Sequence, residues 1–270
     1  MNSSIVEFIY TTIPGRLFLK LIQILRLDKI AVWFLCSSFS RSVIPRYIKK
    51  NHICMEEFTN QKYHTFQEFF LREKKDHTFD PTAEHLISPC DGWLSLYPIE
   101  VNKGFELKGS YYKVDDLIKD RQTAKKFMGG QCLVFRLCAA DYHHYCYIDN
   151  GTISKNQYIE GQLHSVQPVA CEKYPVFSLN RREWTLMETE NFGTVVQTEI
   201  GALVVGGIVN YMTEGQFYKG EEKGRFELSG STIVVFFEKG KIEIRKEILD
   251  ILKNKPETRV TLGMWIGNKK

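Results

Sequence analysis

A serine that follows a glycine is the residue with the clearest chemical potential in this chain. Ser231 lies between Gly230 and Thr232, at the start of the apolar run 233–237. Such a tripeptide commonly marks a turn. A serine hydroxyl can also attack the carbonyl of the preceding residue and convert an amide into an ester, and glycine there tolerates the unusual backbone geometry that the attack needs. The motif therefore indicates either a turn or a self-cleavage site.

An aspartate in a turn-forming sequence is the second candidate. Asp91 lies in the segment Ser88-Pro89-Cys90-Asp91-Gly92. A Pro-x-Asp-Gly sequence is a turn signature in most proteins. The same turn could hold a carboxylate in place to orient a histidine, and this is the functional interpretation of Asp91.

Two adjacent histidines are the candidates for a general base. His143 and His144 follow the predicted strand 133–135, and an imidazole can take or return a proton near neutral pH. With Cys138 and Cys146 they could instead bind zinc, although the Cys-x4-His-His-x-Cys spacing matches no familiar closed site. Histidines that are exposed, or satisfied within the core, are the remaining alternative.

The part of the chain that would hold these residues is predicted to be mainly β from about residue 86 onward. The runs 133–135, 195–199 and 233–237 have the composition of strands, and glycine-containing breaks separate many such runs. Residues 238–241 predict a hairpin connection. The isoleucines of 242–245 alternate with charged residues, which is typical of a half-buried strand.

The first part of the chain is predicted to be helical. Residues 41–75 have a helical pattern, and Asp80-Pro81 breaks it because the residue before a proline disfavours helix. We therefore expect an α+β protein with a helical region over residues 1–80 and a β-rich body over residues 81–270. The body is expected to be a mainly antiparallel barrel or sandwich.

The segment 16–27 has a wide apolar face and a basic edge. Such a helix can lie in a membrane interface with its basic side chains at the headgroups, or it can bury its apolar face on its own domain. The polar stripe consists of Arg16, Lys20, Gln23 and Arg26, and the opposite face of Phe18, Leu21, Ile22 and Leu25.

Positive charge is concentrated at the start of the chain. The 270 residues have a net charge of +4, and residues 1–50 contain eight basic and two acidic residues. These 50 residues therefore carry +6, which leaves −2 for the rest. A basic segment on a near-neutral body predicts an anionic partner for that segment only, and we expect no nucleic-acid partner.

The cysteines and the apolar segments bear on the compartment. The seven cysteines are odd in number and their spacing resembles no disulfide scaffold, which favours a reducing compartment. Glu7 interrupts the start of the chain, and we recognise no secretory signal. The longest apolar stretch, residues 30–40, is about half of the ~20 residues that a membrane span needs.

The three motifs, in their order, resemble the phosphatidylserine decarboxylase family. That family has a Ser-Pro-x-Asp-Gly segment, then Asp-Tyr-His, then Gly-Ser-Thr before an apolar strand. The similarity runs from about residue 60 to the C-terminus, and each motif is modest alone while the ordered set is specific. Further matching segments lie at residues 65–72, 108–112, 161–166, 177–183 and 220–226.

The resemblance implies a role for each motif. Asp91 matches the family's charge-relay aspartate, and His143 matches the histidine of Asp-Tyr-His. Ser231 matches the serine that becomes a catalytic pyruvoyl group after the chain cuts itself between Gly230 and Ser231. The pyruvoyl ketone would form a Schiff base with the amine of the substrate. No metal and no diffusible cofactor is implied.

One position departs from the family pattern. Many members have a second histidine three residues after the first, where this chain has Cys146. The adjacent His144, or His164 in the segment 161–166, could supply that imidazole. The division of labour between the histidines therefore stays open.

The resemblance also implies partners and a location. Self-cleavage would divide the proenzyme into chains 1–230 and 231–270, which would stay together as a heterodimer, and a higher homo-oligomer stays open. The substrate would be phosphatidylserine in an anionic membrane surface, and the product phosphatidylethanolamine. We expect a peripheral protein on the cytoplasmic face of a bacterial cell membrane.

Three alternative functions remain at this point. The nearest is a pyruvoyl-dependent decarboxylase of a soluble amino acid on the same scaffold, against which the amphipathic segment argues. A membrane-bound binding protein that never matures is a second alternative. A zinc module built on the cysteines and histidines is the third.

Overall fold

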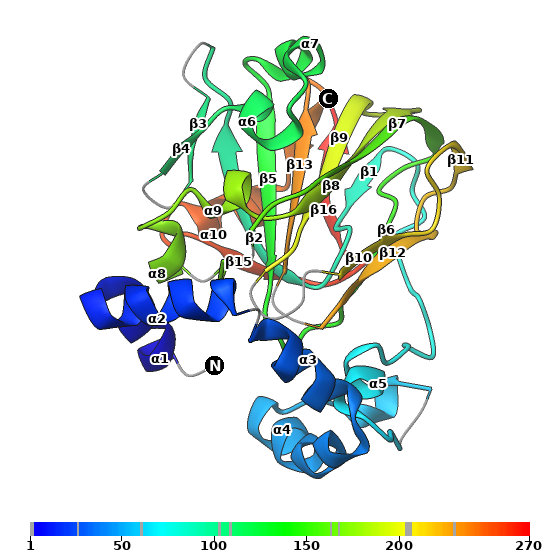
Figure 1. The fold of residues 1–270 in the computed structure, drawn as a ribbon. Helices are drawn as coiled ribbons and strands as arrows, with labels where there is room; N and C mark the ends of the chain where they lie inside the picture. Colours follow the sequence, from blue (N-terminus) through cyan, green and yellow to red (C-terminus); the bar gives the residue numbers. More distant parts are fainter. Residues whose placement is uncertain are drawn as a thin grey trace.

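Helices form the first part of the chain and strands form most of the rest (Figure 1). The structure is a computed structural model. It describes residues 3–25, 27–59, 62–101, 104–107, 110–162, 164–166, 168–202, 207–228 and 231–270. Gly230, one side of the predicted cleavage bond, lies outside the described residues.

The N-terminal helices begin with a helical hairpin. Thr12 caps the second helix by accepting a hydrogen bond from the Gly15 N–H at 3.0 Å. Gly15 is required there, because a Cβ would lie 2.1 Å from the carbonyl oxygen of Phe8. The helices are α1 (Ser3–Thr11), α2 (Ile13–Ile24), α3 (Asp28–Cys36), α4 (Ile44–Asn51) and α5 (Phe66–Phe70), with 3-10 turns η1 (Ser38–Val43) and η2 (Met55–Glu57).

The body is built on an eight-stranded sheet whose pairings are antiparallel. In spatial order its strands are β11 (Gly215–Phe217), β7 (Gly151–Ile159), β8 (Arg182–Thr189), β9 (Gly193–Ile200), β13 (Ser231–Phe237), β5 (Gln131–Leu137), β2 (Gly92–Pro98) and β15 (Thr258–Val260). The strand that begins at the candidate serine is therefore central.

Both faces of this sheet are covered, and this explains why β13 is apolar throughout. Val234 and Phe236 belong to the core on one face, and Ile233, Val235 and Phe237 belong to the core on the other. A strand buried on both faces reads as a continuous apolar run. All seven residues of β13 are buried.

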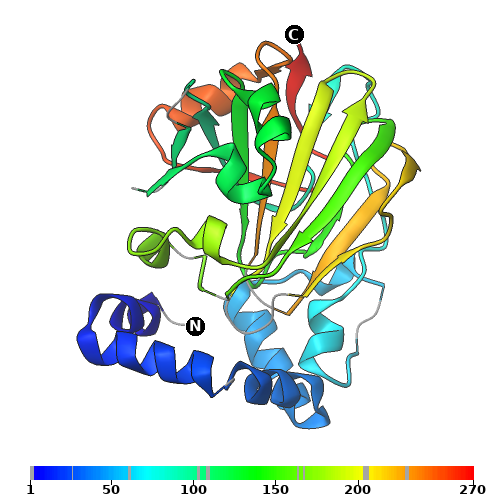
Figure 2. The same ribbon diagram turned by 45° about the horizontal axis from the view of Figure 1, so that its top comes forward.

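Helices cover the first face, as Figure 2 shows. They are α6 (Val114–Ile118), α7 (Arg121–Ala124), η3 (Lys125–Phe127), α8 (Pro168–Cys171) and α9 (Val176–Leu179), joined by the hairpin β3 (Phe105–Leu107) and β4 (Ser110–Tyr112). The N-terminal helices also reach this core, since Ile9, Tyr10 and Leu19 are part of it. The division of the chain at residue 80 stays a prediction.

Two small sheets and a helix cover the second face. One sheet has the order β1 (His85–Ile87), β16 (Trp265–Lys269), β14 (Ile242–Ile244); the other has β10 (Gly207–Asn210), β12 (Glu222–Glu227), β6 (His144–Cys146). The helix is α10 (Lys246–Leu252). The core is completed by layers that stack on the faces of the eight-stranded sheet, and not by closure of that sheet into a barrel. Within the described ranges no pairing joins the edge strands β11 and β15, so the predicted barrel is wrong and the sheets are open.

The structure confirms some of the predictions made from the sequence and corrects others. The α+β class with antiparallel strands is confirmed, as are the strands at 133–135, 195–199 and 233–237. The hairpin at 238–241 is wrong, because β14 pairs with β16 and not with β13. The helical pattern over 41–75 holds only in part, because α4 ends at Asn51 and α5 begins at Phe66.

Candidate active site

Ser231 is the first residue of the central strand. It pairs with Leu137 of β5, and the next residue, Thr232, pairs with Ile200 of β9. Ser231 is 1% exposed, and its Oγ has no hydrogen-bond partner among the residues that the structure describes. A buried polar group without a partner costs about 1–3 kcal/mol, so it calls for an explanation. A hydroxyl kept free of partners is available to act as a nucleophile.

His143 lies at the same end of the central sheet. β5 ends at Leu137, opposite Ser231, and the following loop leads to His143, just before β6. The N–H of Phe226 in β12 donates to the His143 carbonyl at 2.9 Å. The chain between Phe226 and Ser231 is only four residues long, so this hydrogen bond ties the His143 backbone to the segment that enters β13.

The imidazole of His143 has a defined proton arrangement. Its Nδ1 lies 2.8 Å from the carbonyl oxygen of Asp141. A carbonyl can only accept, so Nδ1 carries the hydrogen and Nε2 keeps its lone pair. Nε2 is buried and has no hydrogen-bond partner within the described part of the chain. Burial is the largest of the causes that together lower the pKa of His143 to about 3; the hydrogen bond to the Asp141 carbonyl opposes it, Arg72 and His144 lower the pKa, and Asp91 raises it. The ring is therefore neutral near pH 7, which leaves the Nε2 lone pair able to accept a proton.

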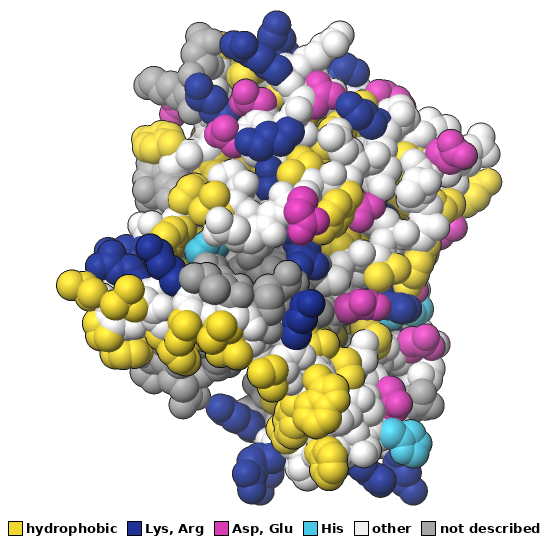
Figure 3. Space-filling model, in the orientation of Figure 1, with side chains coloured by type: hydrophobic (Ala, Val, Ile, Leu, Met, Phe, Trp, Pro, Cys, Tyr) yellow, Lys and Arg dark blue, Asp and Glu magenta, His cyan; other side chains and the backbone are white. Residues whose placement is uncertain are grey.

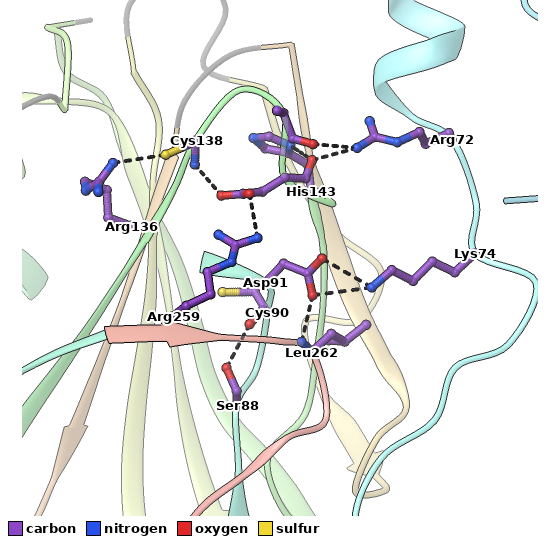
Figure 4. Close-up of polar contacts among 12 residues, drawn as sticks. Arg72, Lys74, Ser88, Cys90, Asp91, Arg136, Cys138, His143, Arg259 and Leu262 are labelled. Carbon is purple, nitrogen blue, oxygen red and sulfur yellow. Dashed lines mark hydrogen bonds and ion pairs between the residues drawn. The ribbon is translucent and has the colours of Figure 1, made fainter. Parts of the chain in front are cut away.

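Asp91 lies beside this loop but has other hydrogen-bond partners (Figure 4). Its carboxylate oxygens are 3.2 and 3.3 Å from Lys74 Nζ, and Oδ1 accepts from the Leu262 N–H at 2.8 Å. Among the described contacts none is a hydrogen bond between the His143 ring and the Asp91 carboxylate. Asp91 acts on the His143 pKa only through space. Its role as the aspartate that orients the histidine stays a prediction.

The other two histidines have different surroundings. His144 is stacked on Tyr142, and its Nδ1 is 2.5 Å from Glu222 Oε1, while its Nε2 is buried without a partner. His164 has both ring nitrogens engaged, by Tyr10 of α1 at 3.4 Å and by Gln162 at 2.8 Å. The geometry favours His143, then His144, as the histidine with a free nitrogen.

Cys146 does not replace the imidazole that many relatives have at its position. Its thiol is buried, and burial raises its pKa to about 12, so it stays protonated near pH 7. Its weak contact is with the Ser88 carbonyl at 3.9 Å. Across the described residues, no group of three His, Cys, Asp or Glu side chains is arranged to hold a metal ion.

Several residues that the motifs gave no role complete the site. Arg72 donates to the carbonyls of Ala140 and Asp141, and Arg259 donates to Asp141 Oδ1 at 2.8 Å (Figure 4). Asp141 Oδ2 accepts from the N–H of Cys138 at 2.6 Å. Arg72 lies in the segment 65–72, which matches the family. That match was the sequence signal that could have identified Arg72 as part of the site. The others become visible only when distant segments meet.

The chain just before Ser231 is held in an uncommon conformation. Leu228 has φ of 35°, in the left-handed region that leucine rarely adopts. Its side chain is 2% exposed and packs in the core of the helical region, with Phe66, Phe69 and Phe70. Such a conformation costs on the order of 1–3 kcal/mol and persists only where packing enforces it. The helical region thus anchors the segment that leads to the predicted cleavage bond.

The family of this chain is established by its sequence relatives. The profile of the phosphatidylserine decarboxylase family matches residues 66–268. The chain is 39% identical to a phosphatidylserine decarboxylase proenzyme 2 of Clostridium acetobutylicum, over 97% of this chain and 91% of that protein. It is 37% identical to a phosphatidylserine decarboxylase proenzyme of Clostridium perfringens (98% and 92%) and 36% identical to one of Ruminiclostridium cellulolyticum (98% and 91%). The chain belongs to the phosphatidylserine decarboxylase family.

Proposed function

We propose that this chain is a proenzyme that cuts itself between Gly230 and Ser231 and then decarboxylates phosphatidylserine to phosphatidylethanolamine. Family membership supports the reaction. The observation that carries the residue assignment is the pair of buried, unpartnered atoms at one end of the sheet, Ser231 Oγ and His143 Nε2. One has a proton to lose and the other a lone pair to accept it.

Self-cleavage begins with proton transfer from Ser231 Oγ to His143 Nε2. The oxygen attacks the Gly230 carbonyl carbon, the peptide C–N bond breaks as the proton on His143 Nε2 passes to the nitrogen of residue 231, and an ester joins residue 230 to the side chain of residue 231. Removal of the α-proton of residue 231 then expels the Gly230 carboxylate and leaves dehydroalanine. Tautomerisation and addition of water release ammonia and leave the pyruvoyl group at the start of the chain 231–270.

The residues at this position fit a pyruvoyl group. Ser231 is buried at the start of a strand held on both sides, so its register fixes the reactive end. The pyruvoyl group supplies an electron sink for the loss of carbon dioxide from a bound amine. We assign the return of a proton to the substrate carbon to His143 Nε2. The uncut chain holds this ring neutral, and the phosphate of an incoming lipid would raise its pKa because an anion favours the charged imidazole.

The N-terminal helices support binding to an anionic membrane. Figure 3 shows apolar patches over α2 and α3 with basic side chains beside them. Exposed side chains of this surface include Ile13, Leu17, Phe18, Leu21, Leu25, Ile30, Trp33 and Phe39, with exposed fractions from 47% to 73%. Large exposed apolar patches mark interaction sites. Most of the described apolar side chains of α2 are therefore not buried on the body, and Leu19 is the one among them that belongs to the core.

The helices of the described residues are too short or too polar to span a bilayer. We propose peripheral attachment, in which apolar side chains of α1 to α3 enter the interface and basic residues contact anionic headgroups. The seven cysteines are free thiols, which suits the cytoplasmic face of a cell membrane. The relatives described above come from bacteria, which supports a bacterial membrane.

Intact-mass analysis and turnover test the proposed reaction. The wild-type chain should yield fragments of residues 1–230 and 231–270, the second with a blocked N-terminus, and Ser231→Ala should remain whole. Phosphatidylserine vesicles should release carbon dioxide and free serine should not. Turnover of free serine instead would favour a soluble-substrate enzyme, and an uncut wild-type chain would favour a binding protein.

Histidine variants test the assignment of the base. His143→Ala should leave the proenzyme uncut, because loss of a general base costs about 10²–10⁴-fold in rate. His164→Ala should cut at nearly the wild-type rate, since both its nitrogens have other partners. If His144→Ala matures but fails to turn over, the two histidines divide the work. Normal cutting and turnover by His143→Ala would remove it from both roles.

Vesicle sedimentation tests membrane attachment. The double variant Trp33→Ser, Phe39→Ser should pellet less with anionic vesicles than the wild type, because it removes two exposed aromatic side chains from the surface. Tyr158→Ser is the control, since Tyr158 is an exposed aromatic residue on β7 of the body. High salt should release only part of the protein, because salt screens charge but not apolar insertion. Equal pelleting of both variants contradicts the assignment.

A further inference from the structure

Arg72 is a buried cation that reaches the loop carrying His143 (Figure 4). It is 3% exposed and lies just after α5. Its Nη2 lies 2.8 Å from the carbonyl oxygen of Ala140 and 3.1 Å from that of Asp141. Its guanidinium also lies over the rings of Phe58 and Phe69, with distances of 4.7 and 5.0 Å to the ring centroids. The described contacts thus place this charge against carbonyl oxygens and aromatic faces.

The Asp141 carbonyl connects Arg72 to the base. The same oxygen accepts from His143 Nδ1 at 2.8 Å and from Arg72 Nη2 at 3.1 Å. Arg72 therefore holds in place the oxygen that fixes the hydrogen on Nδ1. Phe70, two residues before Arg72, lies against the imidazole itself, with 4.1 Å between ring centroids. Residues 70–72 therefore contact both the imidazole of His143 and the Asp141 carbonyl oxygen that accepts its hydrogen bond.

We propose that Arg72 is a positioning residue for His143: it fixes the Asp141 carbonyl so that the imidazole keeps its hydrogen on Nδ1 and presents an unprotonated Nε2 toward Ser231. The proposal rests on the proposed function in that His143 is taken as the base of self-cleavage. In this proposal, a main-chain carbonyl and a guanidinium together determine which ring nitrogen of His143 carries the hydrogen. In a Ser-His-Asp arrangement a carboxylate has this task.

The surroundings explain why a carbonyl can do this. The Asp141 side chain is occupied by the Cys138 N–H and by Arg259, and Asp91 is occupied by Lys74 and Leu262. Neither carboxylate is hydrogen-bonded to the ring in the described contacts. The planar guanidinium donates to two carbonyls from a single nitrogen, whereas the compact ammonium of lysine cannot keep this geometry while stacked on two rings. Arg72→Lys should therefore keep the charge and lose the alignment.

Nitrogen NMR of the histidine rings tests this arrangement without any need for cleavage. The Ser231→Ala proenzyme should show His143 with hydrogen on Nδ1 and an unprotonated Nε2. Adding Arg72→Gln or Arg72→Lys should give a mixture of the two neutral tautomers. Val114→Ala in the same background is the matched control, because Val114 is buried in α6, in the core on the helix-covered face, and has no described contact with the loop 138–143. It should keep the original tautomer.

Cutting rates give the functional readout in chains that retain Ser231. Arg72→Lys should cut about 10- to 100-fold more slowly than wild type, since misplacing a reacting group by about 1 Å can cost ~10²-fold. Val114→Ala should cut at the wild-type rate even if it lowers the melting temperature as much as Arg72→Lys does. The proposal is overturned if Arg72→Lys keeps a single Nδ1–H tautomer and cuts no more slowly than Val114→Ala. A wild-type chain that never cuts refutes the proposed function instead, and the NMR comparison still decides the role of Arg72.

Discussion

Burial of His143 as a neutral ring should make the stability of the proenzyme depend on pH. The perturbation is His143→Gln in the Ser231→Ala chain, which remains uncut and so has a single unfolding transition to follow. Burial, the largest cause, lowers the folded-state pKa of His143 from 6.5 to about 3. In the unfolded chain the ring is hydrated and its pKa returns to about 6.5. Glutamine keeps a polar side chain of similar reach but removes the titration.

The direction in which stability changes with pH follows from which state of the chain, folded or unfolded, binds the proton. Above pH 6.5 the ring is neutral in both states, and its titration contributes nothing to the pH dependence. As the pH falls below 6.5, the unfolded chain takes up a proton that the folded chain refuses until about pH 3, so the free energy of unfolding decreases. The slope approaches about 1.4 kcal/mol per pH unit. Between about pH 7.5 and pH 5 this one residue should remove about 2 kcal/mol of stability.

Urea unfolding at these two pH values measures the effect. The Ser231→Ala chain should lose about 2 kcal/mol more on acidification than the Ser231→Ala, His143→Gln chain. His164, whose pKa is also lowered by burial, adds an acid-dependent loss that is the same in both chains and cancels in the difference. Equal losses in the two chains would mean that His143 takes up a proton readily in the folded state, and its assignment as a buried neutral base would be wrong.

Two further predictions concern other parts of the fold. Lys223→Met should lower the free energy of unfolding by about 3–5 kcal/mol in urea titrations, because it leaves Glu199 as a buried charge without the partner that now lies 2.9 Å away; adding Glu199→Gln should restore part of the loss. Gly263→Ala should lower the melting temperature, with a cost of at least about 1 kcal/mol, because Gly263 has φ of 76° and a Cβ would lie 2.5 Å from the Thr78 carbonyl oxygen.

The sequence predicts the strands best where burial leaves a continuous pattern. The run 233–237 is apolar at every position because β13 is buried on both faces. Ile242 and Ile244 alternate with Glu243 because β14 has one exposed side. The hairpin at 238–241 could not be judged in the same way. A turn sequence shows that the chain reverses direction, but not which strand the next one pairs with, and β14 pairs with β16 at the C-terminus.

The site shows the same limit more clearly. Ser231, Asp91 and His143 could be named because the ordered motifs match the family. The contact from Arg72 to the Ala140 carbonyl joins residues 68 positions apart, and a main-chain carbonyl leaves no trace in residue types. Lys74 was missed for a related reason, since nothing in its local sequence indicates that it pairs with Asp91. Such contacts depend on how the helical region lies against the body.

The position of the cleavage bond in the sheet bears on what happens after the proposed cut. The chain 231–270 would supply the central strand β13, the edge strand β15, and both β14 and β16. β13 is hydrogen-bonded to β5 and β9 along its length, and both neighbours belong to the chain 1–230. Loss of one peptide bond leaves these pairings in place, so the fragments should separate only when the whole sheet unfolds.

The same pairing determines where the new chain end lies. Thr232 is held against Arg136 on one side and Ile200 on the other, one residue from the reactive position. The backbone of residue 231 is therefore fixed by its neighbours and does not need the bond to Gly230 to stay in register. The proposed cut at the first residue of a central strand would free the carbonyl end of the preceding segment, and the new N-terminal group would remain buried beside the loop that carries His143. A cut inside β13 would break the ladder, and a cut several residues earlier would leave a mobile end.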